Sequence, residues 1–260
     1  VVGESLLFNN LIADANPCLT NFSLHIPEVG DSLCICMHRA SGHLDTFINL
    51  KKDMLKELLD EVDRNHVSAF DQPRYLSWFS GRRLTGSDSR VQAQIKFAYQ
   101  PLFSIIVPLY KTPLNFFRDM ADSVIAQTYS NWELILVNST PDYEGLSDLV
   151  SEYVTADSRI IVTNLEGNLG ITENTNVGIK MAKGDYLCFF DHDDVLEPNI
   201  LFEYACALNQ NAEINLLYCD EDKLLPDGSL AHPTFKPDFS LDMARDNNYI
   251  CHLLTVKRAC

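Results

Sequence analysis

The stretch GDYLCFFDHDD, residues 184–194, places the apolar run Asp185–Phe190 directly before an acidic cluster. A short apolar run of this kind is typical of a buried strand. Three carboxylates at the end of a strand repel one another unless a cation lies among them. Hard oxygen ligands suit Mg²⁺ or Mn²⁺, which commonly share their coordination shell with substrate phosphates. The same residues also fit an acidic turn that caps a helix starting near Pro198, and composition alone does not separate the two readings.

Strands and helices alternate on both sides of this stretch, from Pro101 onward. Pro108 is expected to end the first strand, and Gly184 to close the third helix as its C′ residue. This alternation predicts an open, mostly parallel α/β sheet, which binds ligands at the carboxyl ends of its strands. The expected strands are Phe103–Val107, Trp132–Val137, Arg159–Thr163, Asp185–Phe190 and Asn215–Cys219, and the expected helices are Asn115–Gln127, Leu146–Val154, Thr172–Ala182 and Asn199–Leu208.

Residues 1–100 have a different pattern and predict a smaller α+β region. Short strands are expected at Leu6–Leu11, Phe22–Ile26 and Ser32–Met37, followed by an amphipathic helix over Leu44–Val62. The polar segment Gly81–Arg90 fits a connector. We therefore expect two domains, with residues 1–100 as an accessory carbohydrate-binding or protein-docking module, or the end of a preceding catalytic unit, and residues 101–260 as the ligand-binding domain.

Composition excludes some classes of protein. The net charge is −16, from 36 acidic and 20 basic residues, so broad nucleic-acid binding is not expected. No apolar stretch reaches about 18 residues, so no transmembrane helix is expected. The eight cysteines form no CxxC pair. We expect them to be reduced and buried in a cytoplasmic protein, although their even number would also permit disulfides.

Several motifs together resemble one enzyme family. FSIIVPLY (103–110), QTYSNWELILVNST (127–140) and NLGITENTNVGIKMAKGDYLCFFDHDD (168–194) resemble family 2 of the inverting glycosyltransferases, which have the GT-A fold. YCDEDK (218–223), FKPDFS (235–240) and NNYICH (247–252) further resemble a bacterial subgroup of rhamnosyltransferase-like enzymes of cell-surface polysaccharide assembly. The resemblance implies Mn²⁺- or Mg²⁺-dependent transfer from a UDP- or dTDP-sugar to a glycan or lipid-linked acceptor. Association of the full protein with the cytoplasmic face of the membrane is compatible with it.

The resemblance also implies where the nucleotide binds. Pro108 and Tyr110 end the first strand, where the family packs its nucleobase, and Tyr110 would stack on a pyrimidine; it could equally cover the sheet edge. The family's second strand ends in an Asp that bonds the uracil ring, but this chain has Asn138, which leaves uridine and thymidine diphosphates both open.

The loop and helix after the third strand are expected to approach the nucleotide-sugar through Asn168 and Asn176. Both residues could instead serve as turn and capping residues. Many family members carry Arg before the motif Asn, whereas this chain has Thr175. The resemblance therefore implies that neutralisation of the pyrophosphate falls more on the metal.

In the acidic cluster, the resemblance implies that Asp191 holds the ribose or a metal-bound water and that Asp193 binds the metal directly. Asp194 is expected to stabilise the following helix. His192 is expected to point away from its neighbours along an extended chain and not to be a ligand. A late His completes the metal site in some relatives, which makes His252 a candidate ligand beside the alternative of a packed side chain.

The acceptor side is less specified. Asp220, Glu221 and Asp222 are expected to end the fifth strand, either facing the sugar and acceptor or as a solvated charge run. Inversion needs a general base, which the resemblance puts after the strand at Leu253–Lys257 and hence beyond Cys260. The sequence leaves two alternative functions. One is a nucleotide-sugar-binding module without turnover. The other is a pyrophosphorylase, which needs a Gly-rich basic loop that LYKTPLN does not provide.

Overall fold

The computed structural model describes residues 20–25, 32–37 and 72–258. The chain divides into two compact units: Val1–Gly81 with Lys236–Tyr249, and Arg82–Phe235 with Ile250–Cys260. The role of residues 1–100 as an accessory module stays a prediction. The predicted strand Leu6–Leu11 and helix Leu44–Val62 lie outside the described residues. Among the helices that are described, none combines the length and the hydropathy needed to cross a membrane.

The first unit contains a hairpin of β1 (Thr20–His25) and β2 (Ser32–Met37), which pair antiparallel and overlap two of the predicted strands. Two short helices also belong to it, α3 (Gln72–Ser80) and α9 (Leu241–Asp246).

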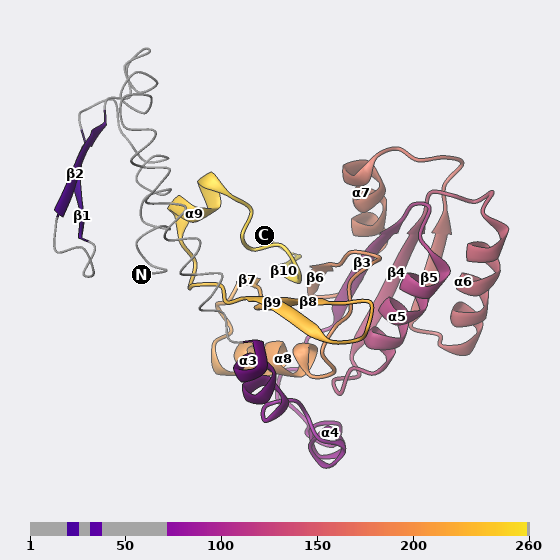
Figure 1. Ribbon diagram of the computed structural model, residues 1–260. Coiled ribbons are helices and arrows are strands. Elements are labelled where there is room, and N and C mark those ends of the chain that lie inside the picture. The colour runs from indigo at the N-terminus through magenta and orange to yellow at the C-terminus, as the bar shows by residue number, and fades with distance from the viewer. Residues whose placement is uncertain (1–19, 26–31, 38–71, 259–260) are drawn as a thin grey trace. The chain divides into compact units, whose positions relative to one another are not determined.

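The second unit is built on a six-stranded sheet in the order β5-β4-β3-β6-β10-β7 (Figure 1). β3, β4, β5 and β6 are parallel, and β10 runs antiparallel to both of its neighbours. The predicted α/β class with a mostly parallel sheet is therefore confirmed. The strands are β3 (Phe103–Leu109), β4 (Trp132–Asn138), β5 (Ile160–Asn164), β6 (Tyr186–Phe189), β7 (Leu216–Leu217) and β10 (Leu254–Lys257).

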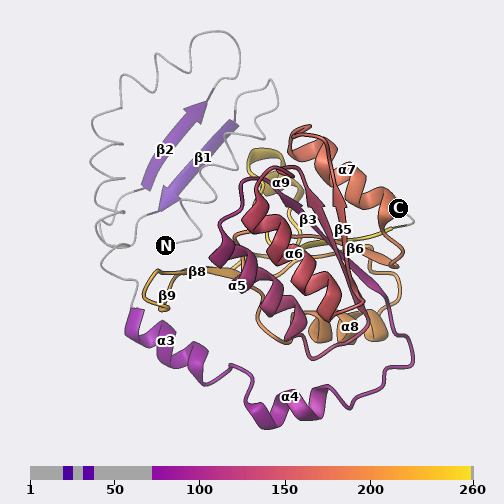
Figure 2. The ribbon, with the colours of Figure 1, turned by 90° about the vertical axis from the view of Figure 1, so that its right-hand side faces the viewer.

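Helices cover both faces of this sheet because β3 and β4 are apolar at every position but a few. Alternate residues such as Ile105 and Val107 pack with α5 (Leu114–Ile125), α6 (Glu144–Ala156) and α8 (Ile200–Gln210), and Figure 2 shows α5 and α6 in front of the strands. Ile106 faces the opposite side, toward α7 (Ile171–Met181). Gly178 of α7 allows this approach, because a Cβ there would collide with Ile106 Cγ2.

Two expectations about Pro and Gly were wrong. β3 does not end at Pro108 but continues to Leu109, pairing with β4 throughout. Pro108 lies past Ile106, the last residue of β3 that pairs with β6, so the strand there has one neighbour and tolerates a missing N–H. Gly184 does not close α7, which ends at Met181. Gly184 is required for close packing instead, since a Cβ there would lie 2.5 Å from Leu102 O.

Two further boundaries differ from the prediction. The fifth predicted strand shrinks to β7, and the acidic residues after it begin a separate hairpin of β8 (Glu221–Leu224) and β9 (Leu230–Thr234). Within the predicted connector, α4 (Gly86–Gln92) forms because Thr85 and Asp88 make a reciprocal capping box. A seven-residue polar helix of this kind buries no apolar face, so periodicity does not reveal it.

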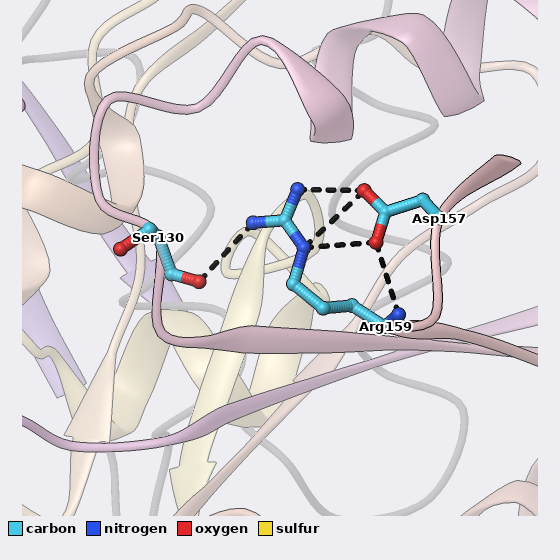
Figure 3. A network of polar contacts seen from close by, with 3 residues as sticks. All are labelled: Ser130, Asp157 and Arg159. Carbon is cyan, nitrogen blue, oxygen red and sulfur yellow. Dashed lines mark hydrogen bonds and ion pairs between the residues drawn. The ribbon is translucent and has the colours of Figure 1, made fainter.

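Polar side chains brace the amino ends of the parallel strands. Glu133 Oε1 accepts hydrogen bonds from Ser104 Oγ and the Lys183 backbone N–H, both at 2.6 Å. Figure 3 shows a second network, in which the Arg159 guanidinium contacts Asp157 and the Ser130 carbonyl. These groups tie together β3, β4, β5 and the segment leading into β6.

Candidate functional site

The site is built where β6 ends and β10 begins. These strands are antiparallel, and Phe189 of β6 lies opposite Leu254 of β10. Consequently the residues just after β6 and just before β10 meet at the same edge of the sheet. They are the acidic segment starting at Asp191, and His252.

Asp191, Asp194 and His252 converge at this edge. His252 Nδ1 lies 2.9 Å from Asp194 Oδ2 and 3.5 Å from Asp191 Oδ2. One ligand atom from each residue lies within 4.8 Å of the others, and among the described residues this cluster does not include Asp193. The three residues offer two carboxylates and one imidazole, a set that suits Mn²⁺ or Mg²⁺.

The backbone conformation explains this selection. Residues 191–194 form a turn in which the Asp194 N–H donates to the Asp191 carbonyl at 3.4 Å. The extended chain assumed for His192 was therefore wrong. In a turn, the side chains at the first and fourth positions approach each other, which brings together Asp191 and Asp194. Whether Asp193 binds a metal stays a prediction.

The surroundings of Asp194 shift the pKa of its carboxyl. Burial raises the pKa of its carboxyl, His252 opposes this, and the charges of Asp191, Asp193 and Glu221 raise it further. Its Oδ2 atom is buried and makes no hydrogen bond in the described part of the chain, although the His252 imidazole lies 2.9 Å away as an ion-pair partner. A carboxylate oxygen that lies 2.9 Å from an imidazole nitrogen and makes no hydrogen bond is placed to share a cation with that nitrogen. The residues therefore fit a divalent metal.

Ser123 of α5 and Gln127, just past the end of that helix, hold the segment that follows the acidic turn. Ser123 Oγ accepts from the Leu196 N–H at 3.1 Å. Gln127 donates to the Glu197 carbonyl at 2.8 Å and accepts from the Leu201 N–H at 3.1 Å. Sequence reasoning missed both, although a polar residue on the apolar face of an amphipathic helix is a usable signal.

The expected helix-stabilising role of Asp194 is not seen. α8 begins at Ile200, its N-cap is Asn199, and no side chain caps it. Asp194 instead lies well before the helix, against His252.

The ends of β3 and β4 lie beside one another. Tyr110 is 42% exposed, and the Lys111 ammonium lies 5.2 Å from the centre of its ring. Asn138 is fully buried: its Nδ2 donates to Asn164 Oδ1 at 2.9 Å and its Oδ1 accepts from the Thr140 N–H at 3.0 Å. Asn138 thus shapes the loop after β4, and its contact with a nucleobase stays a prediction.

The loop before α7 is held by paired amides. Asn168 Oδ1 accepts from the Gly170 N–H and from Asn174 Nδ2, each at 2.9 Å. Asn174 is buried and was not singled out from the sequence. Asn176 lies half-buried within α7. The turn role that was one alternative for Asn168 is present, whereas its approach to a nucleotide stays a prediction.

Comparison with known proteins places the main part of the chain. Residues 104–219 match the family described as glycosyl transferase family 2. This region belongs to that family. It contains β3 to β7 and both carboxylates of the cluster, whereas His252 lies beyond the matched residues.

Individual relatives of this family 2 region have names that are consistent with the family. The O-antigen biosynthesis protein RfbC of Myxococcus xanthus is 32% identical over 184 residues, which are 71% of this chain and 14% of that protein. The uncharacterized glycosyltransferase EpsJ of Bacillus subtilis is 40% identical over 118 residues, 45% of this chain and 32% of that protein. The chain thus spans less than a third of either relative.

Among solved structures, the mannosyltransferase PcManGT from Pyrobaculum calidifontis, in complex with GDP-Man and Mn²⁺, is similar at 16% identity. The alignment covers 59% of this chain and 44% of that chain with a TM-score of 0.41.

Three acidic residues, Asp220, Glu221 and Asp222, follow β7. Asp220 is exposed between β7 and β8, and Glu221 and Asp222 belong to β8, so they do not end the fifth strand as expected. Glu221 is nevertheless close enough to influence the ionisation of Asp194. Their contact with a sugar or acceptor stays a prediction.

Proposed function

We propose that this chain carries the donor-binding site of an inverting glycosyltransferase that uses a UDP- or dTDP-sugar together with Mn²⁺ or Mg²⁺. The observation that carries the proposal is the convergence of Asp191, Asp194 and His252 at the carboxyl end of β6, with a buried Asp194 oxygen that lacks a donor. The family 2 match of residues 104–219 supports the reaction class.

The three converging side chains would hold the divalent cation. A bound cation supplies positive charge that stabilises a diphosphate leaving group. Asp191 is the more exposed of the two carboxylates in the cluster, with a side chain 53% exposed, and would face the ribose or a coordinated water. Asp193, exposed on the same turn, is kept as a second candidate for direct contact.

The chain's own residues would bind and orient the nucleotide. Tyr110 offers an exposed ring on which a pyrimidine can stack. Asn138 and Asn168 would set the shapes of the loops that border the base and the pyrophosphate, with Asn176 on the helix behind them. Pro108 would keep the end of β3 rigid beneath Tyr110.

The names of the relatives support surface polysaccharide assembly as the setting. RfbC is named for O-antigen biosynthesis. A glycan or a lipid-linked saccharide is therefore the proposed acceptor, and Asp220, Glu221 and Asp222 are the proposed residues on its side of the site.

A nucleotide-sugar-binding module without turnover would use the same residues. The transferase and the binding module differ in one product. Only an enzyme that transfers or hydrolyses the sugar releases the nucleoside diphosphate, UDP or dTDP. Measuring UDP or dTDP release from a panel of sugar nucleotides, with and without candidate acceptors, separates them.

Titration calorimetry tests the binding proposal directly. UDP or dTDP should bind in the presence of Mn²⁺, and the heat of binding should disappear in EDTA. The reason is that this chain has Thr175 where many family members have an Arg, so neutralisation of the pyrophosphate falls more on the metal. Equal affinity in Mn²⁺ and in EDTA would overturn the metal dependence. GDP serves as the control nucleotide and should bind more weakly than either pyrimidine nucleotide.

A further inference from the structure

His252 reaches the carboxylates from an unusual backbone conformation. Its φ is 63°, in the left-handed region that a residue with a Cβ rarely adopts. Such a conformation costs free energy and persists only where surrounding contacts hold it. The ladder of β10 with β6 begins at Leu254, so strand pairing does not itself include His252.

Two side chains bind the backbone at and directly after this position. Cys219, just past β7, lies with its sulfur 3.6 Å from the His252 carbonyl oxygen, and it accepts from the Leu253 N–H at 3.5 Å. Tyr204 of α8 donates from its hydroxyl to the Leu253 carbonyl at 3.1 Å. Three successive polar groups of the backbone are thereby held by side chains from two other segments.

The placement of both residues favours a role in positioning. Tyr204 is 5% exposed and packs in the main core, so its hydroxyl is fixed by its ring. The Cys219 thiol can donate and accept at once, which the adjoining C=O and N–H require. A side chain that can only donate would not bind the Leu253 N–H, and one that can only accept would not bind the His252 carbonyl.

We propose that Cys219 and Tyr204 are positioning residues that hold the His252–Leu253 backbone so that the imidazole faces Asp191 and Asp194. The inference rests on the proposed function, because its purpose is a metal centre built from these three side chains. Outer partners of this kind set ligand orientation, and their loss typically weakens metal affinity by about 10–100-fold.

Manganese binding by the whole 260-residue chain tests the inference. The free Mn²⁺ signal in electron paramagnetic resonance gives the dissociation constant for each variant. Cys219→Ala and Tyr204→Phe should each weaken binding by about tenfold or more. Cys219→Ser, whose hydroxyl also donates and accepts, should restore most of the affinity. Cys206→Ala, which removes another half-buried thiol, should bind as the unaltered chain does.

The outcomes separate the two proposals. If the unaltered chain binds Mn²⁺ and Asp194→Ala does not, but Cys219→Ala and Tyr204→Phe bind normally, the positioning role is overturned and the metal centre stands. If the unaltered chain and Asp194→Ala bind equally, the metal centre fails and the positioning role with it. A lower melting temperature in Cys219→Ala or Tyr204→Phe, with unchanged Mn²⁺ affinity in the folded protein, would show a merely structural contribution and also overturn the inference.

Discussion

The carboxylates at the two ends of the parallel strands differ in their hydrogen-bond partners. At the amino ends, buried Glu133 accepts two hydrogen bonds at 2.6 Å and Asp157 is paired with Arg159. At the carboxyl end of β6, the Asp194 side chain is 35% exposed, yet its buried Oδ2 atom has no hydrogen-bond donor among the described residues. One buried polar atom at the amino ends, Trp132 Nε1, also has no hydrogen-bond partner among the described residues.

This difference separates stability from function within one sheet. A buried carboxylate that is fully hydrogen-bonded stabilises the fold, whereas one left without a donor costs free energy. Under the proposed function, a bound cation would offset that cost at Asp194. The comparison predicts that amino-end substitutions change the free energy of unfolding and that carboxyl-end substitutions change binding.

The largest expected effect is at the amino ends. Glu133→Ala should lower the free energy of unfolding by about 3 kcal/mol or more, because two hydrogen bonds to a charged acceptor are lost. The buried Ser104 hydroxyl and the partly buried Lys183 N–H would then lack this acceptor. Urea unfolding followed by circular dichroism measures the change.

The matched control is Glu152→Ala, on the exposed side of α6. It should stay within about 0.5 kcal/mol of the unaltered chain. The Mn²⁺ affinity of folded Glu133→Ala should be unchanged. A large loss of Mn²⁺ affinity there would contradict the separation of the two ends.

The next effect is at the carboxyl end. Asp194→Asn should weaken Mn²⁺ binding by at least about a hundredfold, at or beyond the upper limit for an outer partner. In EDTA the same change should alter the free energy of unfolding by less than about 1 kcal/mol, since it removes both a partly buried charge and its ion pair with His252. Calorimetry and urea unfolding measure the two quantities.

Asp193→Asn is the internal comparison, on the same turn but exposed and outside the cluster. If the geometry selects the ligands, Asp193→Asn should lose less Mn²⁺ affinity than Asp194→Asn. The reverse order would favour direct metal binding by Asp193, as the family resemblance implies.

The sheet could be predicted from the sequence because its strands are buried on both faces. Runs such as Trp132–Val137 are therefore apolar at all positions but Glu133, and the predicted and observed carboxyl ends of β4 differ by one residue. Helices such as α5 were equally clear because one face is apolar and the other is not. The connector helix α4 was missed because capping, and not burial, stabilises it.

The site could be predicted only in part. The acidic cluster and His252 are candidates from the sequence, but the choice of Asp193 over Asp194 rested on the family resemblance, and only the exclusion of His192 rested on an extended chain. A turn of four residues has no periodicity, so nothing in the sequence distinguishes the two geometries. Ser123, Gln127 and Cys219 were missed for a related reason: each acts on the backbone of a segment distant in the chain, and such contacts exist only after folding.

The smallest expected effect returns to the amino ends and separates charge from shape. The Arg159 guanidinium lies 3.7 Å from the centre of the Trp132 ring and donates to Asp157 through two nitrogens. Arg159→Lys keeps the charge but loses the planar stacking and the forked contact, so the free energy of unfolding should fall by about 1 kcal/mol. Arg118→Lys, exposed on α5, is the control and should change it by less than about 0.5 kcal/mol.

The pH dependence of this deficit identifies its origin. The hydrogen bond from Arg159 lowers the pKa of Asp157, so the ion pair contributes stability above the usual carboxyl range and loses it as the pH falls through the lowered value. The difference between the unaltered chain and Arg159→Lys should therefore narrow below about pH 4, leaving the part due to stacking on Trp132, which does not titrate. Urea unfolding at a series of pH values measures it. A deficit that stays constant down to the acid limit would assign the whole effect to stacking and remove Asp157 from the comparison.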